Sequence, residues 1–128
     1  MIRLYAKAVG ITIIVIGMGG LLLGNESLFG VLNIDLSEDA IHLVTGAAMA
    51  AVGFFARDLR VVRAVVGGLG VVYLLVGIVG IFEPTMFGII PHGYDTVLDN
   101  LLHLTLGVLG IAVGFFLGAQ KAPASPAR

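Results

Sequence analysis

Four long apolar stretches, separated by short polar segments, constrain the fold of this chain more than any other feature of its sequence. They cover residues 5–23, 40–56, 61–82 and 97–119, so each contains 17 to 23 residues. A helix that rises ~1.5 Å per residue needs about 20 apolar residues to cross a ~30 Å hydrocarbon core. The pattern therefore predicts an all-α fold, an integral membrane four-helix bundle.

The composition also indicates a membrane protein. Hydrophobic residues make up 59% of the chain and charged residues only 12%, whereas soluble proteins contain about 45–50% and about 25%. The chain has no cysteine, which excludes disulfides, iron–sulfur clusters, thiolate zinc sites and thiol nucleophiles. The first apolar stretch is long for a signal peptide and no Ala-x-Ala cleavage pattern follows it, so we expect a retained first helix.

The charged residues are divided between the two sides of the predicted bundle. All seven basic residues lie at the start of the first helix, at the end of the fourth, or around the link between the second and third, whereas seven of the eight acidic residues lie at the other two connections. Lys and Arg are enriched on the cytoplasmic side of membrane proteins. We therefore expect a multi-pass protein of the bacterial inner membrane with both termini in the cytoplasm, and a disordered tail over residues 120–128.

The second and fourth apolar stretches are related in sequence. Residues 39–55 (DAIHLVTGAAMAAVGFF) and 100–116 (NLLHLTLGVLGIAVGFF) are identical at eight of 17 aligned positions, including one histidine in each. The similarity predicts a single domain over residues 1–119, built from hairpin repeats over 5–56 and 61–119. Because the two hairpins would run in the same direction, the repeat is parallel and differs from the inverted repeats of many transporters.

Glycines recur at intervals of seven residues in every predicted helix. Such a stripe of small residues lets helix backbones approach closely in a left-handed membrane bundle. A further edge at Gly110, Gly114 and Gly118 favours either packing within the chain or a homodimer. The glycines expected at helix contacts are Gly10, Gly17, Gly46, Gly53, Gly70, Gly77, Gly107 and Gly114.

Polar residues near the starts of the second and fourth helices are the candidates for specific chemistry. At 100° per residue, His42 shares a helix face with Gly46 and Gly53, so both repeat histidines are expected to point into the bundle at similar depth. Side chains three and four residues earlier are close enough to hydrogen-bond the rings. The candidate ligand or polar-network residues are His42, His103, Glu38, Asp39, Asp99 and Asn100.

Helix capping is an alternative role for the polar residues at the helix starts. We expect Ser37 to cap the second helix, Asp58 the third and Thr96 the fourth. Acidic side chains in the first turn also suit the positive end of the helix dipole. Part of the acidic pattern is therefore explained without any ligand.

Three functions are compatible with these residues. The favoured interpretation is a polar network in which each histidine hydrogen-bonds across the bundle and fixes helix register. The protein would then be a non-enzymatic accessory or scaffold subunit of a larger membrane complex or a homo-oligomer, with lipid as its surroundings and no nucleic acid partner. The alternative is a haem, a pigment or a divalent metal ion bound by His42 and His103, with carboxylates assisting. An enzymatic role has less support, because the sequence contains no nucleophile–base pair, phosphate loop or catalytic motif.

The chain also resembles a known family, most specifically in its second half. The residues concerned are GVVYLLVGIVGIF at 70–82 and the Asn-x-x-His-Leu-x-x-Gly segment at 100–107, whose first copy has Asp39 at the asparagine position. This pattern resembles a bacterial family of small four-helix integral membrane proteins catalogued as a domain of unknown function. The resemblance extends over nearly the whole chain and implies a four-helix topology without implying an activity.

Overall fold

The computed structural model describes residues 1–23, 27–28, 32–33, 35–90 and 97–117. Most of these residues are helical, which confirms the predicted all-α class. The helices are α1 (Ile2–Leu23), α2 (Leu36–Phe55), α3 (Leu59–Phe82) and α4 (Val97–Ile111), and the π-helix η2 (Ala112–Leu117) continues α4.

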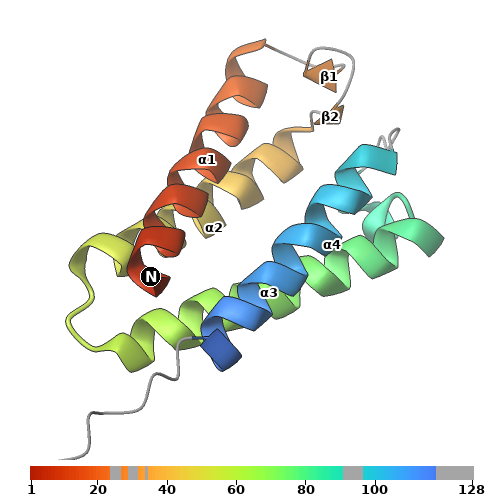
Figure 1. The fold of residues 1–128 in the computed structure, drawn as a ribbon. Helices are drawn as coiled ribbons and strands as arrows, with labels where there is room; N and C mark the ends of the chain where they lie inside the picture. Colours follow the sequence, from red (N-terminus) through yellow and green to blue (C-terminus); the bar gives the residue numbers. More distant parts are fainter. Residues whose placement is uncertain (24–26, 29–31, 34, 91–96, 118–128) are drawn as a thin grey trace, which may run out of the picture.

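Smaller elements lie at the end of the molecule that carries the α1–α2 and α3–α4 connections, which we call the loop end (Figure 1). The two-residue strands β1 (Ser27–Leu28) and β2 (Leu32–Asn33) pair antiparallel between α1 and α2. The 3₁₀-helix η1 (Met86–Gly88) follows α3 and has positive φ angles throughout. The opposite end carries the short link between α2 and α3 and is called the link end.

The starts of α2 and α3 are capped by aspartates. Asp35 accepts a hydrogen bond from the backbone N–H of Ser37 at 2.8 Å, so α2 begins at Leu36. The prediction that Ser37 caps this helix is therefore wrong: the aspartate two residues earlier already accepts an exposed N–H group of the first turn. Asp58 accepts from the N–H of Arg60 at 2.8 Å and caps α3 as predicted. Thr96, the expected cap of α4, lies outside the described residues.

The helices associate in two hairpins, α1 with α2 and α3 with α4 (Figure 1). Glycines account for the close approach inside each hairpin. A Cβ atom added to any of the eight glycines of the seven-residue stripes would lie at most 3.0 Å from an atom of the other helix in the same hairpin. Gly110 and Gly114 pack against Gly70 and Gly67, so this edge is used within the chain, whereas Gly118 lies outside the described residues.

An arginine of the first helix in each hairpin holds the end of the second helix. The guanidinium of Arg3 donates to the carbonyls of Ala56 and Arg57 after α2. The guanidinium of Arg63 donates to two carbonyls of η2, at 3.0 and 3.1 Å. The last carbonyls of a helix lack hydrogen-bond partners inside the helix, and these arginines provide the missing donors.

The two hairpins contact each other mainly at the link end. A buried apolar cluster there joins the start of α1, the end of α2 and the start of α3. Its members are Ile2, Ala6, Met49, Val62 and Val66. Nearer the loop end the hairpins enclose two cavities, and the candidate site lies between the two cavities.

Three of the described helical segments are long and apolar enough to cross a membrane: α1, α3, and α4 together with η2. The 20-residue α2 is not among them, because its first two turns carry Glu38, Asp39 and His42. That α2 is the fourth span, as the sequence predicts, stays a prediction.

Two neighbouring glycines of α3 allow a test of the glycine packing. A Cβ at Gly70 would lie 2.5 Å from the backbone nitrogen of Ile111, whereas a Cβ at Gly68 would meet no atom within 4 Å. Overpacking costs about 1–3 kcal/mol, and alanine is about 1 kcal/mol better than glycine inside a helix. We expect Gly70→Ala to lower the thermal unfolding midpoint in detergent and Gly68→Ala to leave it unchanged or raise it. Equal shifts in the two variants would contradict close packing at Gly70.

Candidate metal site between the hairpins

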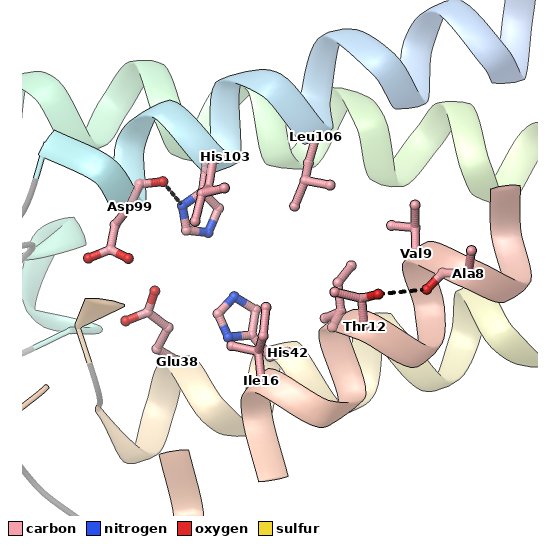
Figure 2. A pocket seen from close by; sticks show the side chains of 11 residues that line it. Ala8, Val9, Thr12, Ile16, Glu38, His42, Asp99, His103 and Leu106 are labelled. Atoms are coloured by element: carbon pink, nitrogen blue, oxygen red, sulfur yellow. Dashed lines mark hydrogen bonds between the residues drawn. The ribbon is translucent and has the colours of Figure 1, made fainter. Parts of the chain in front are cut away.

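Four of the six candidate residues meet between the two hairpins. Glu38 and His42 come from α2, and Asp99 and His103 come from α4 (Figure 2). All four line a cavity of about 240 Å³ that α1 closes on a third side. The sequence prediction that the two histidines point toward the interior at similar depth agrees with this placement.

The spacing of these residues explains their arrangement. In both helices the histidine follows the carboxylate by four residues, and side chains four apart lie one above the other on the same helix face. The two carboxylates, of Glu38 and Asp99, therefore face each other nearer the loop end, and the two rings face each other one turn deeper (Figure 2). Both carboxylates are buried, with exposed fractions of 4% each.

Three aromatic rings lie close together at the level of the histidines. The ring centroids of His42 and His103 lie 5.9 Å apart with their planes inclined by 16°. The ring of Tyr73 in α3 lies 5.6 Å from that of His103, with the planes inclined by 27°. The hydroxyl of Thr45 donates to the carbonyl of Ile41 at 2.8 Å. The Tyr73 hydroxyl, 2.7 Å away, therefore donates to Thr45 and ties α3 to α2.

The hydrogen bond of His103 determines which of its nitrogens carries the proton. Its Nδ1 lies 2.7 Å from the backbone carbonyl oxygen of Asp99. A carbonyl only accepts, so Nδ1 carries the proton and Nε2 keeps a lone pair. In Figure 2 this second nitrogen lies on the side of the ring that faces His42. Histidines that bind metals commonly donate their other N–H to a carbonyl in this way.

His42 has an unused polar atom. Its Nδ1 is buried and has no hydrogen-bond partner among the described residues. A buried polar group without a partner costs about 1–3 kcal/mol. The ring is thus held at the site by packing, with its Cβ position close to Gly17 of α1, and it retains the capacity to bind a ligand.

Glu38, His42 and His103 form a group with the spacing of metal ligands. One ligand atom from each residue can be chosen so that all three lie within 4.8 Å of one another. Two ligands that are each about 2.1 Å from the same ion lie at most about 4.2 Å apart. Side-chain movements of less than about 1 Å would therefore bring all three atoms into contact with one ion. Imidazole and carboxylate together suit zinc and its first-row neighbours.

A second cavity lies on the other side of the same residues. Its volume is about 130 Å³, and it is enclosed by α2, α3 and the segment that contains η1. Glu38, His42 and His103 line both cavities and so stand between them. Residues on the far side of the smaller cavity include Tyr73, Met86 and Ile90.

The remaining two candidates lie elsewhere. The carboxylate of Asp39 packs inside the first hairpin, where a Cβ on Gly20 of α1 would lie 2.0 Å from its Oδ1. Asn100, the equivalent residue of α4, is not among the residues that line either cavity, and its Oδ1 has no partner in the described part of the chain. Conversely, Tyr73 and Thr45 belong to the site although neither is among the candidates from the sequence. The available signal was that Thr45 follows His42 by three residues and shares its face.

The chain was also compared with known proteins. No family model, no curated protein and no solved structure matched it. The interpretation of the site therefore depends on the geometry described above.

Proposed function

We propose that this chain is a membrane protein that binds a divalent transition-metal ion between its two hairpins, through Glu38, His42 and His103. The observation that carries the proposal is the convergence of three ligand atoms from both hairpins within 4.8 Å. Two of the residues belong to the first hairpin and the third to the second. Two histidines with one carboxylate are a ligand set found in zinc sites that keep a fourth position open.

A metal ion is favoured over a haem or another flat pigment. Two facing histidines can hold a haem iron from opposite sides, but the macrocycle then needs the space around the iron to be free of side chains. A carboxylate oxygen of Glu38 lies within 4.8 Å of ring nitrogens of both histidines and so lies in that space. For a small ion the same oxygen is a ligand.

The orientation of one histidine also suits a metal ion. The buried Nδ1–H of His103 is already directed at a backbone carbonyl, so Nε2 is oriented without a contribution from the ion.

The contacts among these aromatic rings support a second candidate role. His42, His103 and Tyr73, together with the hydrogen bond from Tyr73 to Thr45, connect the two hairpins at one level. The same residues would then fix hairpin register in a non-enzymatic accessory or scaffold subunit, alone or as a homo-oligomer. Metal titration separates the two roles, because only the first requires an ion.

The proposed location is the bacterial inner membrane, with α2 as the fourth span. Basic residues mark the link end, as at Arg3 and Arg63, and acidic residues mark the loop end, as at Glu83 and Asp99. The positive-inside rule then assigns the link end and both termini to the cytoplasm.

Single cysteines test this topology, since the chain has none of its own. Arg57 lies in the link between α2 and α3, and Ile89 follows η1 at the loop end; both are exposed. We expect a membrane-impermeant maleimide to label Ile89→Cys in intact cells, and Arg57→Cys only after the membrane is opened. Labelling of both from the same side would refute the four-span arrangement.

Two adjacent acidic residues test the metal site. Zinc should bind detergent-purified protein at one ion per chain and stabilise it by about 2.7 kcal/mol when the free ion is at 100 times its Kd. Glu38→Gln removes a ligand charge and should weaken zinc binding at least about tenfold. Asp39→Asn changes the neighbouring side chain, which packs on Gly20, and should leave affinity unchanged. Isothermal titration calorimetry measures both, and equal affinities for the two variants would contradict the assigned ligands.

A further inference from the structure

The larger cavity continues from the proposed metal site along α1. Its wall on this helix runs from Ala8 to Ile16, a rise of about 12 Å along an α-helix. Leu106 of α4 lies on the opposite wall (Figure 2), and Leu102 of the same helix also lines the cavity. The cavity is therefore elongated, with apolar walls and the carboxylates and imidazoles at one end.

The one hydroxyl along the α1 wall of the cavity needs no hydrogen bond from a ligand. Thr12 donates to the carbonyl of Ala8 at 2.9 Å, within its own helix. Both residues are exposed, so the cavity is accessible on this side, between α1 and α4. In a bilayer this side would face lipid chains, and an apolar molecule could enter from the membrane.

We propose that this cavity binds a single-chain lipid whose neutral head group donates a lone pair to the metal ion. The inference rests on the proposed metal-binding function. Three protein ligands leave a fourth position on a tetrahedral ion, and the chain of such a lipid would extend from that position along α1. Two carboxyl groups, those of Glu38 and Asp99, already line this end of the cavity, so a neutral head group suits the site better than an anionic one.

Cobalt provides a spectroscopic probe of the fourth position. Co²⁺ occupies zinc-type sites, and its d–d absorption changes when a ligand enters or leaves the coordination sphere. The neutral probe is 1-dodecylimidazole, which combines a nitrogen donor with a 12-carbon chain. Dodecanoate has a similar chain with an anionic head, and 1-methylimidazole has the donor without the chain.

Two adjacent residues of α1 allow a substitution inside the cavity to be compared with one on the exposed surface of the helix. Thr12→Phe places a large side chain inside the cavity, whereas Ile11 is exposed and does not line it. We expect both Thr12→Phe and Ile11→Phe to bind cobalt as the wild type does. The d–d band should respond to 1-dodecylimidazole at one molecule per chain in the wild type and in Ile11→Phe, and at least about tenfold more weakly in Thr12→Phe.

The possible failures are distinct. No cobalt band before ligand is added would overturn the metal site and this inference with it. A cobalt band that does not respond to 1-dodecylimidazole would overturn the inference alone, as would equal responses of the two phenylalanine variants. If 1-methylimidazole changed the cobalt band as strongly as the long-chain probe does, binding of the chain in the cavity would be contradicted. Tighter binding of dodecanoate would contradict the neutral head group.

Discussion

Backbone contact between helices at glycine residues is the interaction on which the rest of this structure depends. Inside each hairpin the two helices are close enough that a single added Cβ would collide with the partner backbone, as at Gly10 and Gly107. Close packing of this kind fixes the rotation of each helix against its partner. It thereby decides which side chains lie inside a hairpin and which project toward the other one. Glu38 and His42 reach the space between the hairpins because the adjacent face of α2 is committed to α1.

Contact between the hairpins is of a different kind. At the link end they share a small apolar cluster around Val62 and Val66. At the level of the histidines they meet through aromatic rings and the hydrogen bond between Tyr73 and Thr45, with a cavity on each side. An ion bound by residues of both hairpins would join the more open parts of the molecule. Its binding free energy would then act directly on the separation of the hairpins, as metal binding and folding are coupled in small metal proteins.

The sequence predicted features set by spacing along one helix, including which glycines lie at helix contacts, but it did not predict the rotation of one helix against another. Helix positions and the depth of the histidines follow from hydropathy and spacing. The different positions of Glu38 and Asp39 do not follow from the sequence. The two side chains are 100° apart around α2, and only the contact with α1 sets the rotation of α2 that places Asp39 on Gly20. Tyr73 reaches the site for the same reason, since its partner Thr45 is on the other hairpin. The π-helical end of α4, where an arginine of α3 donates to two carbonyls, was also not predicted.

The low hydropathy of α2 follows from the same arrangement. Glu38 and Asp39 sit in its first turn and His42 in the next, so α2 is the least apolar of the four helices although it is long enough to span. Ionisable groups at membrane depth are costly and are found where they have partners or a function. Here Asp39 is enclosed by α1, while Glu38 and His42 face α4 and the equivalent pair on it. Pairing α2 with α4 across the hairpins allows the polar groups at both helix starts to be buried at one site.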